Sequence, residues 1–139
     1  MLEYTLRTYQ SPTRLVQRLG AIQELGNEAG SLGMRRPLLV TDPGVKAAGL
    51  LDTALAALRG SDCEPVVFDR VKANPGVELV DAGAAEYRAQ GCDGLVAIGG
   101  GSSMDTAKGI GVVAVHDGSI LDYEWGNSPI HSRIPPLIS

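Results

Sequence analysis

The sequence predicts an α/β fold in which helices flank a parallel, Rossmann-like sheet. Three short apolar runs, each suited to a strand buried on both faces, alternate with three segments of helical periodicity. The connections between them are short, which implies right-handed crossovers and therefore parallel strands. The expected strands cover residues 36–41, 64–69 and 93–99, and the expected helices cover residues 42–60, 74–91 and 102–116.

Apolar residues at helical spacing mark the face that each of these helices turns toward the sheet. Within 42–60 they are Val45, Ala48, Leu51, Leu55 and Leu58, and Gly60 is the expected stop. Within 74–91 they are Val77, Val80, Ala84 and Tyr87. The third helix is apolar nearly all round, so we expect it to be well buried.

Two strands and a helix are expected before this core. Residues 2–9 alternate branched or aromatic side chains with polar ones, which predicts a strand. Residues 13–19 follow a Ser-Pro break and are the candidate second strand of an N-terminal β-hairpin. Residues 20–33 then carry apolar side chains at helical spacing before two glycines, which predicts a helix.

The regular pattern fades after His116. A short helical turn is expected at residues 119–123, followed by a proline-rich approach to residues 135–139, which look like the start of another strand. A natural domain seldom finishes on a strand-like apolar run, so the sequence is expected to be truncated.

Composition limits the classes of function. A length of 139 residues predicts a single domain, residues 1–139, and the net charge of −4 without a basic cluster argues against nucleic acid. No apolar run is long enough to span a bilayer, and the N-terminus does not resemble a signal peptide. Cys63 and Cys92 lack metal-site or redox spacing, so they are expected to be reduced thiols in a cytoplasmic protein.

Open parallel sheets bind ligands outside the carboxyl ends of their strands. That rule selects residues 41–42, 71–74 and 99–103, which should lie on one rim. The third of these, with Gly99, Gly100 and Gly101, fails two familiar phosphate motifs. A dinucleotide fingerprint would need glycine at Met104, and a P-loop would need its lysine earlier than Lys108.

The glycine loop, residues 99–101, nevertheless has features that are typical of an anion-binding site. Its three glycines leave the backbone bare, and a helix begins immediately afterwards with Ser102 as the expected N-cap. A helix N-terminus of this kind commonly holds a diphosphate. The alternative is a tight turn in which Ser102 and Asp105 form a pair similar to a capping box. Asp42 and Asn74 each precede a proline, so helix capping alone would account for both residues.

Residues 99–111, "GGGSSMDTAKGIG", resemble the GGGSxxDxAK signature of the iron-containing (metal-dependent, group III) alcohol dehydrogenase family. Further segments resemble the family in order and spacing, so the likeness covers essentially the entire chain. They are residues 18–26 "RLGAIQELG", 38–52 "LLVTDPGVKAAGLLD", 68–83 "FDRVKANPGVELVDAG" and 134–139 "IPPLIS".

The resemblance implies an N-terminal α/β domain that binds NAD(P), similar to the N-terminal domain of dehydroquinate synthase, followed by an all-helical domain. The family's metal ligands, an aspartate and three histidines, belong to the second domain. His116 and His131 match none of those positions. The chain is therefore expected to be the cofactor-binding part of an iron or zinc enzyme acting on a small alcohol or aldehyde. It should contain no metal ligand and no catalytic residue, and it should be inactive alone.

The resemblance also implies roles for individual residues. Asp42 would accept hydrogen bonds from the adenosine ribose, which favours NAD over NADP because a carboxylate repels a 2′-phosphate. Asn74 would lie near the cofactor, and Asp105 would cap the helix or face the nicotinamide ribose. The diphosphate would be surrounded by Gly99, Gly100, Gly101 and Ser102. Lys108 is expected to pair with Asp105 structurally, while Ser103 and Met104 are assigned to packing.

Two other functions stay open at this point. The chain could be a stand-alone nucleotide-binding module without a catalytic domain, or a lyase similar to dehydroquinate synthase. The form of the residues 99–108 signature resembles the dehydrogenases more closely. The expected N-terminal strand offers an edge for a homodimer, which nothing else in the sequence requires.

Overall fold

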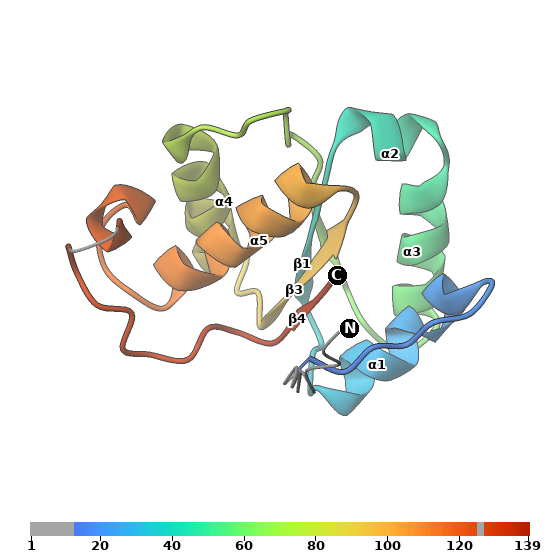
Figure 1. The fold of residues 1–139 in the computed structure, drawn as a ribbon. Coiled ribbons are helices and arrows are strands. Elements are labelled where there is room, and N and C mark those ends of the chain that lie inside the picture. Colours follow the sequence, from blue (N-terminus) through green and yellow to red (C-terminus); the bar gives the residue numbers. More distant parts are fainter. Residues whose placement is uncertain (1–12, 125–126) are drawn as a thin grey trace, which may run out of the picture.

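The computed structural model describes residues 13–124 and 127–139. Four parallel strands form one sheet in the order β2-β1-β3-β4, with helices on both faces (Figure 1). The strands are β1 (Pro37–Thr41), β2 (Val66–Phe68), β3 (Gly94–Ile98) and β4 (Leu137–Ile138). The expected α/β fold with a parallel sheet is confirmed, and the strand-like end of the sequence forms β4.

Strand β1 is the centre of the sheet. It pairs in parallel with β2 through Leu38 and Val66, and with β3 through Leu39 and Val96. All five of its residues are buried, because strands flank it on both sides and helices cover both of its faces. This burial accounts for its continuous apolar composition, which is typical of central strands in parallel sheets.

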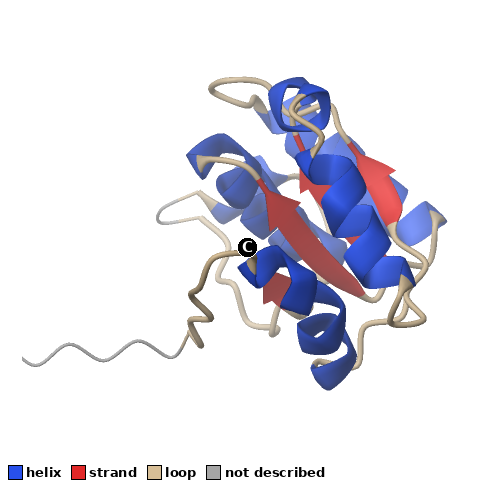
Figure 2. Cartoon of the chain, turned by 90° about the vertical axis from the view of Figure 1, so that its right-hand side faces the viewer, coloured by secondary structure: helices blue, strands red, loops and turns tan. Residues whose placement is uncertain are grey.

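Two helical layers enclose the sheet, as Figure 2 shows. Helices α4 (Val77–Ala89) and α5 (Gly101–Ala114) pack on one face, and α1 (Leu25–Ser31) and α3 (Leu50–Arg59) pack on the other. Alternation along the strands divides the core accordingly. Leu38, Val40, Leu95 and Ala97 belong to the α4 and α5 side, while Leu39 and Val96 belong to the α1 and α3 side.

The expected helix over residues 20–33 is confirmed. It begins as the 3₁₀ turn η1 (Ala21–Glu24) and continues as α1, which buries Leu25 and Ala29. The N-terminal β-hairpin is not confirmed. Its first expected strand, residues 2–9, lies outside the described residues. The second, residues 13–19, is exposed and forms no strand, and its two arginines, Arg14 and Arg18, form ion pairs with Glu28 of α1 and Glu24 of η1.

The single helix expected over residues 42–60 is wrong, because the chain forms two helices there. Helix α2 (Pro43–Ala47) ends at a turn through Gly49, whose φ of 78° interrupts the helical path before α3. Leu51 and Leu58 are buried as expected, and Leu55 is partly buried. Ala48 is exposed in the turn, and Ala54 takes the inward position instead.

Helices α4 and α5 pack directly against each other. Val80, Ala84 and Tyr87 are buried as the spacing predicts, whereas Val77 is only partly buried. The two helices approach so closely that a Cβ on Gly83 would lie 2.3 Å from Ile110 Cδ1. Beyond α5, the expected helical turn is confirmed as η2 (Ile120–Tyr123), closed by a capping box. None of the described helices is long and apolar enough to cross a membrane.

Candidate functional site

The carboxyl ends of β1, β2 and β3 meet at one rim, at the upper edge of the sheet in Figure 1. The buried Thr41 joins them. Its hydroxyl donates to the Ile98 carbonyl at 2.7 Å, and its carbonyl accepts from the Val71 N–H at 3.2 Å. The expectation that the three selected stretches share a rim is therefore confirmed.

Asp42 follows β1 directly and caps α2. Its backbone is extended, Pro43 occupies the first helical position, and its Oδ1 accepts from the Val45 N–H at 3.0 Å. The expected capping role is confirmed. The other carboxylate oxygen, Oδ2, accepts a hydrogen bond from Ser103 Oγ at 3.4 Å. Both oxygens are therefore engaged, and the carboxylate is held beside the start of α5.

Helix α2 is itself fixed to the rim by an ion pair. Lys46 Nζ lies 2.6 Å from Asp69 Oδ2, immediately after β2. The hydrogen bond from Lys46 lowers the pKa of Asp69, and the same hydrogen bond raises the pKa of Lys46. The ion pair therefore joins α2, the helix that Asp42 caps, to the end of the neighbouring strand β2.

Gly99 is required by the fold itself. Its φ of 146° is accessible mainly to glycine, and a Cβ there would lie 2.6 Å from Ser103 Oγ and 3.0 Å from Asp42 Oδ2. Any side chain at Gly99 would therefore displace the groups that surround the carboxylate.

Gly100 and Gly101 differ from Gly99 in this respect. A Cβ on either residue would meet no atom within 4 Å, and neither has a positive φ. The fold thus does not need glycine at these two positions, and the space above them is free for an external group. Within the described part of the chain, no acceptor binds the N–H groups of Gly101 and Ser102, and no side chain caps α5. Bare backbone and free N–H groups suit an anion.

The start of α5 differs from expectation in two respects. Gly100 is the N-cap, so Ser102 lies within the first turn, where its carbonyl accepts from Thr106 Oγ1 at 2.7 Å. Because Ser102 lies inside the helix and not at its N-cap, the expected capping-box pair with Asp105 does not form. Asp105 instead lies 3.5 Å from Lys108 Nζ, which confirms the structural ion pair, and the Asp105 side chain is 75% exposed.

Asn74 is not the N-cap of α4, contrary to expectation. Gly76 is the N-cap, and Asn74 lies two residues earlier in a left-handed turn with a φ of 50°. Asparagine tolerates this conformation better than most residues, which gives a local reason for its presence. Its side chain is exposed in the rim loop.

Ser103 is the residue that sequence reasoning missed, since it was assigned to packing alone. It is 1% exposed, and its hydroxyl reaches the Asp42 carboxylate across the boundary between β1 and β3. Its place in the first turn of α5 could have signalled an inward hydroxyl. The partner could be identified only once β1 and β3 were known to be neighbours.

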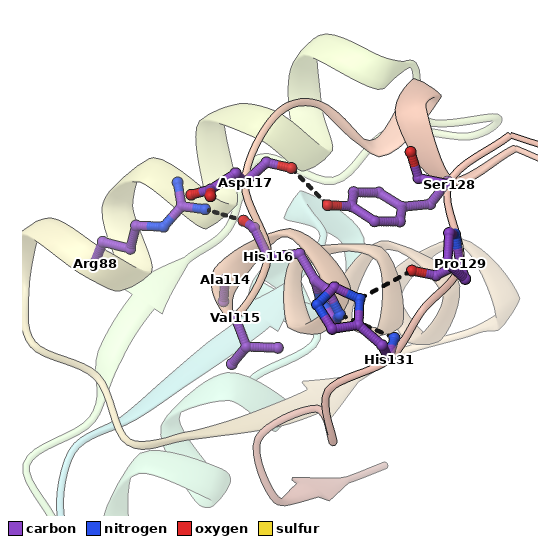
Figure 3. A pocket seen from close by; sticks show the side chains of 9 residues that line it. Arg88, Ala114, Val115, His116, Asp117, Ser128, Pro129 and His131 are labelled. Atoms are coloured by element: carbon purple, nitrogen blue, oxygen red, sulfur yellow. Dashed lines mark hydrogen bonds between the residues drawn. The ribbon is translucent and has the colours of Figure 1, made fainter.

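Away from the rim, a hollow of about 530 Å³ lies at the opposite end of α5 (Figure 3). The buried His116 forms its wall and donates from Nδ1 to the Val112 carbonyl at 2.7 Å. Its Nε2 accepts from the backbone N–H groups of His131 and Ser132 at 3.3 and 3.1 Å. Both ring nitrogens are thus used within the fold. Among the described residues, no three His, Cys, Asp or Glu side chains are grouped to hold a metal ion.

Comparison with known proteins agrees with the sequence signature. Residues 12–139 match the family described as iron-containing alcohol dehydrogenase. The chain is 49% identical over 132 residues to choline dehydrogenase of Bacillus subtilis (strain 168), covering 94% of this chain and 33% of the relative. It is 47% identical over 123 residues to 4-hydroxybutyrate dehydrogenase of Cupriavidus necator, covering 86% and 32% respectively.

Solved structures show the same fold. NADH-dependent butanol dehydrogenase A of Thermotoga maritima has a TM-score of 0.87 at 27% identity, with 95% of this chain and 33% of that chain covered. Sulfoacetaldehyde reductase of Bifidobacterium kashiwanohense, in complex with NAD⁺, has a TM-score of 0.84 at 29% identity, with 96% and 35% covered. The chain spans about a third of the length of these relatives. From its sequence and its fold, the chain belongs to the iron-containing alcohol dehydrogenase family and matches the N-terminal portion of its members.

Proposed function

We propose that residues 1–139 form the NAD-binding domain of a metal-dependent alcohol dehydrogenase or aldehyde reductase, and that the rim binds the dinucleotide. One observation carries the proposal. Gly100 and Gly101 are glycines that the fold does not require, and they lie where free N–H groups of α5 face open space beside the Asp42 carboxylate. Such a loop suits a ligand that bears both an anionic group and hydroxyls.

The two halves of the proposed site have complementary chemistry. The backbone of Gly99, Gly100 and Gly101 and the first turn of α5 at Ser102 supply N–H donors for the diphosphate. Asp42 supplies an acceptor for the adenosine ribose hydroxyls. A 2′-phosphate at the same place would face a carboxylate with no cation bonded to it among the described contacts, so NAD is preferred over NADP.

Asn74 and Asp105 are assigned to the periphery of the site. Asn74 lies in the rim loop after β2, where its exposed amide is available to the cofactor. Asp105 lies one turn into α5 with most of its side chain exposed, and we assign it as an acceptor for a ribose hydroxyl on the nicotinamide side. Its weak pairing with Lys108 costs little to rearrange, because exposed ion pairs contribute about 0–1 kcal/mol.

The bound dinucleotide would supply the hydride acceptor or donor for interconversion of a small alcohol and its aldehyde. This chain's part is to bind and orient the cofactor. Iron or zinc, the catalytic groups and the substrate contacts are assigned to a second, helical domain on family grounds, so the isolated chain is inactive. Location in the cytoplasm and assembly as a homodimer belong to the same proposal.

A stand-alone nucleotide-binding module is the second candidate, because all of the residues that we assign to the cofactor site belong to this chain. The lyase alternative has less support. The signature at residues 99–108 is of the dehydrogenase form, and the relatives described above are named dehydrogenases or reductases.

Titration of the 139-residue protein with NADH, followed by the fluorescence of the dihydronicotinamide, tests the proposal. We expect saturable binding of NADH, weaker binding of NADPH, and no oxidation of any alcohol in the presence of Fe²⁺ or Zn²⁺. Absence of NADH binding by the folded protein would refute the cofactor site. Metal-dependent turnover by the 139-residue chain would refute its assignment as the cofactor part alone.

A further inference from the structure

We propose that Ser103 is a positioning residue for Asp42, and that its hydroxyl sets part of the discrimination between NAD(H) and NADP(H). The inference rests on the proposed cofactor site and names a residue that the family signature leaves variable. Its basis is the hydrogen bond from Ser103 Oγ to Asp42 Oδ2, which joins the first turn of α5 to the end of β1.

Ser103 is well placed to hold another group. The residue is 1% exposed, and its own N–H donates to the Gly100 carbonyl at 3.1 Å, so its backbone is fixed by the turn that starts α5. A buried hydroxyl has a restricted choice of acceptors, and the acceptor of Ser103 Oγ is the Asp42 carboxylate, at 3.4 Å. The bond therefore orders Asp42 from a rigid support.

The two bonds to Asp42 divide its oxygens between them. Oδ1 accepts from the Val45 N–H, and Oδ2 accepts from Ser103. A carboxylate offers about four lone-pair sites, so about two stay available for the hydroxyls of a ribose. With both oxygens held, the plane of the carboxylate is fixed. With Oδ1 alone held, the group is free to rotate about its Cβ–Cγ bond.

The rest of the surroundings cannot replace Ser103. Gly99 lies beside Oδ2 and Gly44 beside Oδ1, since a Cβ on each would be 3.0 Å from the respective oxygen. Both are bare backbone that offers no side chain to orient the carboxylate. Within the described chain, the side-chain hydrogen bond to Asp42 comes from Ser103. Loss of that hydroxyl should therefore leave the orientation of the Asp42 carboxylate less fixed.

A positioning role and a purely structural role make different predictions. If Ser103 only stabilised the fold, its loss would weaken both cofactors equally. If it orients Asp42, its loss weakens NADH, which uses the oriented carboxylate, and leaves NADPH nearly unchanged. The contact is long, at 3.4 Å, so we expect the effect of one ordinary hydrogen bond, a change of about three- to tenfold in affinity.

The test is a titration of the wild-type protein and of Ser103→Ala with NADH and with NADPH. Ser103→Cys fills nearly the same volume with a weaker donor, so it separates loss of the hydrogen bond from loss of packing. Thr106→Ala is the matched control, because it removes another buried hydroxyl from α5 that bonds to a backbone carbonyl and not to Asp42. Melting temperatures of all four proteins monitor the fold.

We expect Ser103→Ala to raise the Kd for NADH about three- to tenfold and to change the Kd for NADPH less than twofold. Ser103→Cys should stay close to Ser103→Ala, and Thr106→Ala should preserve the wild-type ratio of the two constants. If Ser103→Ala left the ratio of the two Kd values unchanged, the positioning role would be overturned. The proposed function would still stand in that case, provided that the wild type binds NADH. A wild type that binds neither cofactor would overturn both.

Discussion

Gly99, at the end of β3, lies directly against the carboxylate of Asp42, at the end of β1. A Cβ on Gly99 would be 3.0 Å from Asp42 Oδ2 and 2.6 Å from Ser103 Oγ. This closeness is possible only because both strands end at the same rim and because the backbone at Gly99 has a φ of 146°. The bare backbone here serves the protein's own packing, before any ligand is considered.

Gly99→Ala should therefore damage the fold as well as the site. A side chain in this backbone region costs about 1–3 kcal/mol, and the new methyl group would also push Ser103 or Asp42 aside. We expect urea denaturation to show a loss of about that size, together with weaker NADH binding. Unchanged stability would contradict the conformation assigned to Gly99.

Gly101→Ala should separate binding from stability. Its Cβ would meet no protein atom within 4 Å, so the free energy of unfolding should stay within about 0.5–1 kcal/mol of wild type. The same methyl group would occupy the space assigned to the diphosphate, and we expect the Kd for NADH to rise at least about tenfold. Gly30→Ala is the matched control, since its Cβ also meets open space but lies in α1. Equal NADH affinities for the two variants would exclude the glycine loop as the phosphate site.

Asp42→Gly should change cofactor preference with little effect on stability. Glycine is tolerated as an N-cap at a cost of a few tenths of a kcal/mol, so α2 should be retained. The variant loses both the ribose acceptor and the negative charge. We expect the ratio of NADPH to NADH affinity, measured by parallel titrations, to rise about tenfold or more. Asp42→Asn removes the negative charge but keeps a capping side chain. Its affinity for NADPH should therefore rise while the cap of α2 is retained. If wild type binds both cofactors equally, the specificity role of Asp42 is wrong.

Asn74 has two candidate roles, and a pair of variants distinguishes them. Its left-handed conformation predicts that Asn74→Ala costs about 1 kcal/mol, whereas Asn74→Gly keeps the stability of wild type. If the amide also contacts the cofactor, Asn74→Gly should still weaken NADH binding. Thermal unfolding and NADH titration of both variants provide the measurements. If Asn74→Gly bound NADH with wild-type affinity, the role of Asn74 would be limited to stabilising the left-handed turn.

The two thiols should make the fold sensitive to alkaline pH. Burial raises the pKa of Cys63 and raises that of Cys92 from the ordinary value of 9.0 to about 11. Between about pH 9 and 11 the folded protein therefore binds more protons than the unfolded chain, and the free energy of unfolding falls as pH rises. Urea titrations at pH 8 and pH 10 test this, and Cys92→Ala should show a smaller fall. Native Cys92 should also react with iodoacetamide far more slowly at pH 9 than the unfolded protein does.

Local signals explain which parts of the fold could be predicted from the sequence. The three core strands β1, β2 and β3 and the Asp42 cap depend on runs of neighbouring residues, and they form where expected. Glycines in helical segments were ambiguous. Gly49 breaks its helix, whereas Gly109 and Gly111 lie inside α5, where a Cβ would crowd Val80 Cγ1 at 2.9 Å and Leu95 Cδ1 at 3.1 Å. Only tertiary packing decides between a break and a close approach.

The candidate site shows the same division. The glycine loop and Asp42 could be selected because strand ends in a parallel sheet share a rim. The contact from Ser103 to Asp42 could not, because it depends on β1 and β3 being neighbours, and the order of strands is not written in any single segment. The left-handed turn at Asn74 was missed because an asparagine before proline also fits an N-cap.

His116 links the carboxyl end of α5 to a later segment of the chain through hydrogen bonds. Helix α5 is a rod of about 21 Å, with the glycine loop at its amino end and His116 just beyond its carboxyl end. The two backbone N–H groups that His116 holds belong to the segment that leads into β4, the edge strand beside β3. These hydrogen bonds therefore join the carboxyl end of α5 to the outer edge of the sheet, so that one helix connects the glycine loop with the segment that positions the edge strand.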